Sequence, residues 1–404
     1  MSKHIVVLSQ YFYPENFRIN DICNEFINSG YKVTVITGIP NYPKGKFFKG
    51  YGYFRKRKEK YGDINIIRLC ILPRLSNPLF LVLNYLSFVI SGWFWAKFTR
   101  IRADIIFNFE VSPMTQALPA VWFSKRLKIP FVLYVQDLWP ENLEIIGNVK
   151  NRFILSKVKK MVKYIYDNST KILVTSLSFK QSILELGYKE NQVIVWHQYA
   201  EDFYKPKKDK QLNKESEVLK IVFTGNIGES QGLDILPKTA LVLKNNGYLD
   251  KIRFIIIGDG RYKNELIRAI EESNVTEMFN FIGMKPATEI PDLLARHDVA
   301  FVSFKDNDLF NKTIPAKLQS YLACGLPILA AASGETEKII KEANCGKTSS
   351  PGDVMGLVKN IISYLNTSEI EIKLLGKNSL KYSDENFRKE ILMNEINNIF
   401  AEVM

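Results

Sequence analysis

The sequence is poor in the residues that build metal centres and disulfide frameworks. It has four cysteines and three histidines in 404 residues, and the cysteines stand far apart at Cys23, Cys70, Cys324 and Cys345. No CxxC pair and no Cys–His spacing occurs, so we expect neither a disulfide framework nor a metal site. The apolar run at the N-terminus is also too short for a signal peptide. These absences favour a chain that works in the reducing cytoplasm.

Glycine is missing from the first predicted βα loop, at residues 10–16. This absence argues strongly against an NAD-dependent enzyme, whose first loop needs glycines for close approach to the pyrophosphate. Hydrophobic residues make up 46% of the chain and charged residues 24%, which excludes a disordered or fibrous protein. The length predicts two domains, each large enough to bury its own core.

Short apolar runs rich in β-branched residues alternate with helical patterns along the chain. The runs predict strands at 5–9, 32–36, 64–69, 105–108, 131–134, 171–174, 193–195, 219–224, 252–257, 279–282, 299–304 and 327–331. Helices are predicted at 20–28, 116–126, 233–246, 262–273, 289–294, 315–324, 335–342 and 354–365. The alternation predicts an α/β fold with two doubly wound, Rossmann-like domains facing a central cleft. We expect domains at 1–200 and 218–380, a Lys-rich linker at 201–217 and a helical segment at 381–404.

The positive charge is concentrated in the first half of the chain. Residues 1–200 carry 28 Lys+Arg and 13 Asp+Glu, whereas residues 201–404 carry 27 and 29. Only the first half is therefore expected to meet a polyanion, and nucleic acid or an anionic membrane surface are the usual partners. No nucleic-acid reading motif accompanies the charge, so the membrane is favoured.

One apolar stretch, at 79–96, strengthens the membrane interpretation. It contains Trp93, Phe94 and Trp95, follows the cationic run at 55–58, and is flanked by basic residues. A helix lying in the membrane interface fits best. A half-buried domain helix and a true membrane span are the alternatives, although the stretch is short for a span. Residues 152–164 add a second basic, amphipathic helix.

Three glycine-bearing turns follow strands of the second domain. Gly225, Gly228 and Gly232 lie in the first turn, where close backbone approach at a helix start suits a phosphate, or else serves packing. A similar turn holds Gly258 and Gly260. The third turn, at Gly283, could pass along a flat base.

The segment 311–330 contains the largest number of residues that indicate a ligand site. Pro315 marks a helix start, and Lys317 follows in the first turn, where a cation is unfavourable unless an anion lies nearby. This arrangement predicts an anion site. Asp306 and Asp308 form a D-x-D pair, which is either a metal pair or, more commonly, two solvated carboxylates.

Taken together and in this order, these motifs resemble the C-terminal half of retaining GT-B glycosyltransferases of family 4. The segments 9–15 (Ser-Gln-Tyr-Phe-Tyr-Pro-Glu) and 136–141 (Gln-Asp-Leu-Trp-Pro-Glu) are similar to WbuB-type L-fucosamine transferases of bacterial surface polysaccharide synthesis. The resemblance covers essentially the whole chain. It is specific for the family and much less so for the sugar.

The resemblance implies a donor site in the second domain, but with departures. The family's diphosphate-binding Arg and Lys fall at Asn226 and Gln231, and its two glutamates fall at Lys312 and Ser320. Lys317, Lys312 and the backbone N–H groups of 225–228 then remain to neutralise the leaving group. The expected donor-binding residues are Gly225, Asn226, Gly228, Gln231, Gly283, Lys312, Lys317, Gln319 and Ser320.

The first domain is expected to bind the acceptor. Asp137, with Glu141 beside it, is expected to orient or deprotonate the acceptor hydroxyl; the alternative is that Asp137 caps the following helix. Glu15, Asn16, Arg18 and Asn41 are expected to line the acceptor loop. Arg18 could meet an acceptor diphosphate or be an ordinary exposed arginine.

The resemblance implies a retaining enzyme that needs neither metal nor cofactor. Its expected partners are a nucleotide sugar, UDP-N-acetyl-L-fucosamine, and a polyprenyl-diphosphate-linked glycan of O-antigen or capsule synthesis. Its expected place is the inner face of the cytoplasmic membrane, as a peripheral protein. The alternatives are a related transferase with another donor sugar, and a non-catalytic membrane-associated protein that binds nucleotide sugars, which the missing glutamates suggest.

Overall fold

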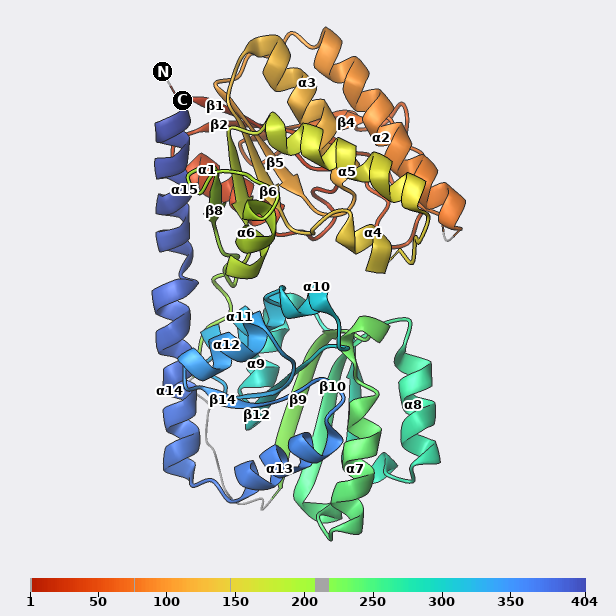
Figure 1. The fold of residues 1–404 in the computed structure, drawn as a ribbon, viewed down its shortest axis with the longest axis vertical. Coiled ribbons are helices and arrows are strands. Elements are labelled where there is room, and N and C mark those ends of the chain that lie inside the picture. Colours follow the sequence, from red (N-terminus) through yellow and green to blue (C-terminus); the bar gives the residue numbers. More distant parts are fainter. Residues whose placement is uncertain (1, 76, 146, 208–217) are drawn as a thin grey trace. The chain divides into compact units, whose positions relative to one another are not determined.

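The chain forms two compact α/β units in a computed structural model that describes residues 2–75, 77–145, 147–207 and 218–404 (Figure 1). Unit 1 contains Met1–Thr175, Phe179–Trp196 and Met393–Met404, and unit 2 contains Ser176–Ser178 and His197–Leu392. The predicted linker at 201–217 falls largely on residues 208–217, which lie outside the described residues.

Unit 1 is built on an eight-stranded sheet in the order β3-β4-β2-β1-β5-β6-β7-β8. Its strands are β1 (His4–Leu8), β2 (Lys32–Gly38), β3 (Lys58–Tyr61), β4 (Ile64–Leu69), β5 (Ile105–Glu110), β6 (Phe131–Val135), β7 (Lys171–Val174) and β8 (Val193–Val195). All neighbouring pairs are parallel except β3–β4. The strand order reverses between β1 and β5, so the loops after these two strands lie at the switch point where such sheets bind ligands.

The helices of unit 1 cover this sheet. They are α1 (Ile19–Asn28), α2 (Pro78–Phe98), α3 (Leu118–Leu127), α4 (Glu141–Ile145), α5 (Arg152–Asp167), α6 (Leu177–Leu184) and, from the C-terminus, α15 (Lys389–Val403). Figure 1 shows α2, α3 and α5 together on one face of the sheet. Phe107 of β5 points the other way and packs against Phe26 of α1 and Phe400 of α15.

All seven strands predicted in the first half are present, but β3 was not predicted. It is formed by part of the cationic run, which lacks the apolar pattern of a buried strand. Lys58 and Lys60 point to solvent from this edge strand, while the ring of Tyr61 stacks on Tyr13 at 4.2 Å. Charged residues are common on edge strands because they discourage further pairing.

Unit 2 is built on a six-stranded parallel sheet in the order β11-β10-β9-β12-β13-β14. Its strands are β9 (Leu219–Asn226), β10 (Ile252–Asp259), β11 (Phe279–Gly283), β12 (Val299–Ser303), β13 (Ile328–Ala331) and β14 (Gly346–Ser349). Its helices are α7 (Ile235–Asn245), α8 (Lys263–Glu272), α9 (Ile290–Leu294), α10 (Asp308–Asn311), α11 (Ala316–Ala323), α12 (Glu335–Glu342), α13 (Val354–Leu365) and α14 (Glu369–Asn386). The strand order reverses between β9 and β12.

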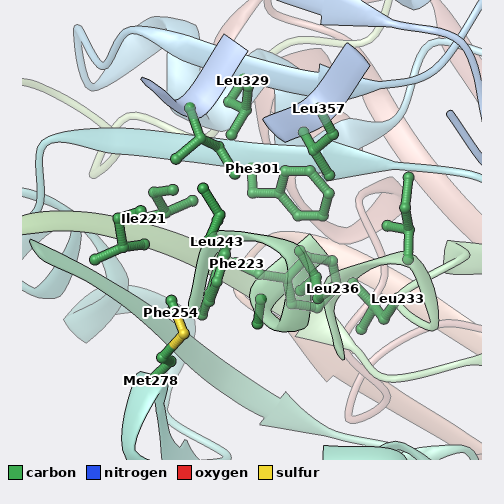
Figure 2. Packing of buried hydrophobic residues seen from close by; sticks show 14 of the residues in the cluster. Ile221, Phe223, Leu233, Leu236, Leu243, Phe254, Met278, Phe301, Leu329 and Leu357 are labelled. Carbon is green, nitrogen blue, oxygen red and sulfur yellow. The ribbon is translucent and has the colours of Figure 1, made fainter. Parts of the chain in front are cut away.

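Two apolar clusters lie on opposite faces of this sheet, because successive strand residues alternate between faces. Ile221 and Phe223 belong to one cluster, with Leu236 of α7 and Leu357 of α13 (Figure 2). Val222, between them, belongs to the other, with residues of α9, α11 and α12. A sheet covered on both faces is what the continuous apolar runs predicted.

The C-terminal helical segment predicted at 381–404 does not match a structural boundary. Residue 381 lies inside α14, and unit 2 extends to Leu392. Residues 393–404, which include most of α15, belong to unit 1, and Phe400 packs there against Phe26, Tyr31 and Phe107. The apolar side chains of this part of the helix are buried against residues of unit 1 that are distant in sequence. The local sequence pattern does not reveal which domain they pack against.

Candidate active site

The glycine turns of unit 2 meet at the carboxyl ends of β9, β10 and β11. The register pairs Gly258 with Gly225, and a Cβ on Gly258 would lie 1.9 Å from the carbonyl oxygen of Gly225. Gly258 is therefore needed for packing. Gly225 has φ of +119°, and the atom nearest to an added Cβ would be Lys317 Nζ at 3.7 Å, an ordinary van der Waals distance. The structure thus brings together Gly225 and Lys317, two residues predicted to bind the donor.

Lys317 is a partly buried cation that has no carboxylate partner among the described residues. Its ammonium donates a hydrogen bond of 2.6 Å to Gln231 Oε1 and lies 3.7 Å from the centre of the Phe223 ring. Burial lowers its pKa to about 7. The position lies in the first turn of α11, where the helix dipole favours an anion rather than a cation. An anionic ligand would supply the missing counter-charge.

Two further contacts hold this group of residues in place. Tyr321, one turn after Lys317 on α11, accepts a hydrogen bond of 2.7 Å from the backbone N–H of Thr224 on β9. Ser303, at the end of β12, donates a hydrogen bond of 2.6 Å to the carbonyl of Gln231. The end of β9 is therefore bound to α11, and the loop that follows it is bound to β12, at the point where the sheet order reverses.

The other residues predicted at the donor site are placed in different ways. Asn226 is exposed, and its amide nitrogen lies 2.7 Å from where a Cβ of Gly228 would be; Gly283 faces open space at the end of β11. The buried Gln319 donates to the carbonyl of Gln198 at 2.6 Å, and its Oε1 has no hydrogen-bond partner among the described residues.

The two positions where the family has glutamates are occupied by Lys312 and Ser320. Lys312 follows α10 and accepts a hydrogen bond from Ser176 through its carbonyl oxygen at 2.6 Å. The buried Ser320 hydroxyl donates to Ala316 of its own helix at 3.2 Å. Asp306 and Asp308 are exposed. Within the described residues, no group of three or more His, Cys, Asp or Glu side chains is placed to hold a metal ion.

In unit 1, Glu15 and Asn41 stabilise from inside the loop that was predicted to bind the acceptor. The buried carboxylate of Glu15 accepts hydrogen bonds from the backbone N–H groups of Asn41 at 2.7 Å and Tyr42 at 2.6 Å. Burial raises the pKa of Glu15 to about 7, although these two hydrogen bonds oppose the shift. The Asn41 side chain bonds the backbone of Ile39 and of Arg74. Both side chains therefore act as supports of the loop.

Asn16 and Arg18 lie in the same loop and at the start of α1. Asn16 is exposed. Arg18 is partly buried, and its charge lies close enough to the Tyr134 hydroxyl to lower the pKa of that group against the larger effect of burial. Arg18 is therefore not an ordinary exposed arginine.

Asp137 does not cap the helix that follows it. Its Oδ2 accepts hydrogen bonds from the backbone N–H of Ser112 at 2.8 Å and from the Ser112 hydroxyl at 2.7 Å. Trp139 donates to the same hydroxyl at 3.3 Å. The capping alternative is thus wrong, and Asp137 is held between the ends of β5 and β6, partly exposed. Glu141 is the exposed first residue of α4.

A second carboxyl group, Glu110, lies beside Asp137 at the end of β5. It is fully buried, and neither carboxyl oxygen makes a hydrogen bond of normal geometry within the described residues. Burial, together with the charge of Asp137, raises its pKa well above the ordinary value. This acid, favoured in its protonated form, adjoins a partly exposed carboxylate that can accept a proton from a bound hydroxyl.

Family comparisons identify the two domains. A model described as Glycosyltransferase Family 4 matches residues 17–198, and one described as Glycosyl transferases group 1 matches residues 204–381. The chain is a glycosyltransferase with a family 4 domain and a group 1 domain. The family 4 domain covers most of unit 1, and the group 1 domain covers most of unit 2.

The glycosyltransferase is similar to several characterised or named proteins. It is 24% identical over 355 residues to the colanic acid biosynthesis glycosyl transferase WcaI of Escherichia coli (strain K12), covering 82% of this chain and 84% of that one. It is 24% identical over 303 residues to the sulfoquinovosyl transferase SQD2 of Arabidopsis thaliana, covering 72% and 55%. The match to the amylovoran biosynthesis glycosyltransferase AmsK of Erwinia amylovora is 22% identical over 231 residues, covering 56% and 54%. The chain spans about half the length of the last two relatives.

Solved structures confirm the predicted GT-B fold class. Sucrose-phosphate synthase from Thermosynechococcus elongatus matches with a TM-score of 0.77 at 14% identity, covering 99% of this chain and 98% of that one. HepE of Anabaena, solved in complex with UDP, matches with a TM-score of 0.70 at 14% identity and full coverage of both chains, 100% each. At this identity the likeness concerns the fold.

Sequence reasoning missed several residues of the glycosyltransferase's two sites. Glu110 had a visible signal, an acid that ends an otherwise apolar strand at the switch point of the sheet. The hydroxyl of Tyr321 and the pairing of Ser112 with Asp137 had none, because each joins segments far apart in sequence.

Proposed function

We propose that this glycosyltransferase is a retaining enzyme that transfers a sugar from UDP-N-acetyl-L-fucosamine to a polyprenyl-diphosphate-linked glycan in O-antigen or capsule synthesis. The observation that carries the proposal is Lys317, a side chain that has no carboxylate partner among the described residues and lies beside the glycine loop at Gly225. WcaI and AmsK are named for polysaccharide biosynthesis, which supports this class of pathway. The UDP bound to HepE supports a UDP-linked donor.

On the donor side, the diphosphate leaving group needs stabilisation as negative charge develops on it. In this proposal Lys317 supplies a positive charge, and the backbone N–H groups near Gly225 and Gly228 supply hydrogen bonds, without a metal. The side chain of Gln231 holds the ammonium at 2.6 Å. Its position is therefore set before the donor arrives, so little reorganisation is needed during the reaction.

On the acceptor side, we assign Asp137 the task of orienting and deprotonating the acceptor hydroxyl. Two hydrogen bonds from Ser112 to one carboxylate oxygen leave the other oxygen, Oδ1, available to accept a proton. Glu110, buried beside it and favoured in its protonated form, does not add a second full negative charge.

The surface of α2 supports a peripheral place on the membrane. Positions 84, 88, 92 and 96 are buried, whereas the opposite face exposes Leu79, Phe80, Val82, Leu86, Ile90, Trp93, Phe94 and Phe98. The helix is long and apolar enough to cross a membrane by length and composition, and only 22% of its most apolar segment is buried in the protein. Asn84, Ser87 and Ser91 all bond to backbone groups of residues 70–72. These bonds hold α2 on unit 1, which favours an interfacial position over a span.

The alternative of a non-catalytic nucleotide-sugar-binding protein rests on one observation. Lys312 and Ser320 stand where the family has glutamates, and the Ser320 hydroxyl is engaged with its own helix. Melting temperatures in the presence of different nucleotide sugars would identify the donor, since only a ligand of the folded state stabilises it. The same donor would then be incubated with the protein and a lipid-linked acceptor. Turnover supports the enzyme, and donor binding without turnover supports the alternative.

A further inference from the structure

Arg74 is a cation whose charge is not neutralised by any described carboxylate. It lies four residues before α2, and within the described part of the chain its polar contacts are with Asn41 and Tyr11. Arg68, at the end of β4, differs: it is fully buried and paired with Glu59. Arg68 thus has a structural role, whereas the charge of Arg74 remains available to a ligand.

Aromatic side chains orient the Arg74 guanidinium without neutralising it. The group lies 5.4 Å from the centre of the Tyr42 ring, and Nη1 lies 3.4 Å from the Tyr11 hydroxyl. Tyr11 in turn stacks on Phe17 at 5.0 Å. Tyr85 of α2 also lies close, because the charge of Arg74 influences its hydroxyl. Burial raises the pKa of both Tyr11 and Tyr85, so neither hydroxyl places a negative charge beside Arg74.

Buried polar groups build this arrangement. Glu15 fixes the backbone of Asn41 and Tyr42, and the Asn41 side chain accepts a hydrogen bond of 2.9 Å from the backbone N–H of Arg74. The loop that carries Tyr42 and the segment that carries Arg74 are thus held together from below. Glu15 and Asn41, expected to touch the acceptor, instead position the residues that can do so.

The neighbours of this cluster indicate which kind of anion it would meet. Tyr85 belongs to α2, the helix whose opposite face exposes the apolar residues Leu79, Phe80, Val82, Leu86, Ile90, Trp93, Phe94 and Phe98. Tyr85 also feels the charge of Asp137, which we assign to the acceptor hydroxyl. The cluster therefore lies between the residue that would activate the acceptor and a helix suited to the membrane interface. A lipid that carries phosphate groups and a reactive glycan fits both neighbours.

We propose that Arg74, oriented by Tyr11 and Tyr42, binds the diphosphate of the polyprenyl-linked acceptor. The proposal rests on the proposed function and adds the residues that recognise the acceptor's anionic group. The same chemistry could come from the phosphate of an ordinary anionic phospholipid, so the test must separate the two sources.

The test uses the full chain and two probes, farnesyl diphosphate and vesicles of phosphatidylcholine with phosphatidylglycerol. Arg74→Gln is compared with Arg100→Gln, which removes an equal charge from an exposed residue just beyond the other end of α2. We expect Arg74→Gln to weaken farnesyl diphosphate binding at least tenfold and to leave vesicle binding at the level of Arg100→Gln. Because the bond from Arg74 to Asn41 uses the backbone, the variant should keep the melting temperature of the wild type.

Three results decide the outcome. Unchanged farnesyl diphosphate binding in Arg74→Gln overturns the proposal, as does a loss confined to the phosphatidylglycerol vesicles. Arg74→Lys, which keeps the charge, should recover part of the affinity if Arg74 meets an anion. Binding of a UDP-sugar is measured in the same samples. If the wild type binds no UDP-sugar, the proposed function fails, while the farnesyl diphosphate result still decides the role of Arg74.

Discussion

Donor binding should be coupled to proton uptake by Lys317. Burial lowers the pKa of this side chain to about 7, so at pH 8 about nine-tenths of it is neutral before the donor arrives. A bound diphosphate favours the charged ammonium and raises the pKa again. Binding at pH 8 should therefore take up about 0.9 proton, and the affinity should fall about eightfold between pH 7.5 and pH 8.5.

The assay is titration calorimetry with the UDP-sugar that stabilises the protein most. The diphosphate of such a donor is esterified at both ends and does not titrate in this range. Enthalpies measured at pH 8 in buffers of different ionisation enthalpy give the number of protons taken up. Lys317→Met should abolish the uptake and weaken binding by about 1.5–3 kcal/mol, or about 10- to 150-fold. The control is Lys251→Met, an exposed lysine at the amino end of β10.

The reasoning is refuted if the wild type shows the same binding enthalpy in every buffer, or if Lys317→Met still takes up the proton. The ligand-free protein offers a second check. Because the pKa of Lys317 is lowered from 10.5 to about 7, the unfolded chain binds more protons between these values. Stability should therefore rise with pH through this window, and the rise should be smaller in Lys317→Met.

Three further predictions concern unit 1. Asp137→Asn should lower turnover by at least tenfold while the donor affinity stays unchanged; retained turnover would leave Asp137 with only its structural bonds to β5. Because the pKa of Glu110 is raised in the folded protein, the free energy of unfolding should fall as the pH rises above 4.5. Glu110→Gln, which cannot titrate, should show a smaller fall. Melting curves from pH 5 to pH 8 would check this against the exposed control Glu144→Gln, and parallel curves for all three proteins would contradict it. Neutralising the cationic run at 55–58 should release the protein from anionic vesicles. Undiminished co-sedimentation with the vesicles would show that this run does not bind the membrane.

The fold was largely predictable because its strands are short, continuous apolar runs whose burial on both faces is visible locally. The elements that were missed depend on distant partners. β3 is formed by charged residues that pair with β4, and the apolar side of α15 packs on Phe26 and Phe107, more than two hundred residues away in sequence.

The candidate site could be predicted where a residue is unfavourable in its own local structure unless a ligand is present. Lys317 in the first turn of a helix was such a signal, and the structure places it beside Gly225 and Gln231. Side-chain direction was not predictable. Glu15 and Asn41 lie in the expected loop but form hydrogen bonds within the protein. Arg74, one of the basic residues that flank the apolar stretch at 79–96, has no carboxylate partner among the described residues.

Sugar transfer to a lipid-linked acceptor tests the central claim most directly. The purified protein would be incubated with labelled UDP-N-acetyl-L-fucosamine and a polyprenyl-diphosphate-linked glycan in anionic vesicles. The lipid fraction would then be analysed for label and for anomeric configuration. We predict labelled lipid in which the donor's configuration is retained, with the yield reduced in both Lys317→Met and Asp137→Asn. Donor binding without labelled lipid, for this and every other UDP-sugar that stabilises the protein, would contradict the account.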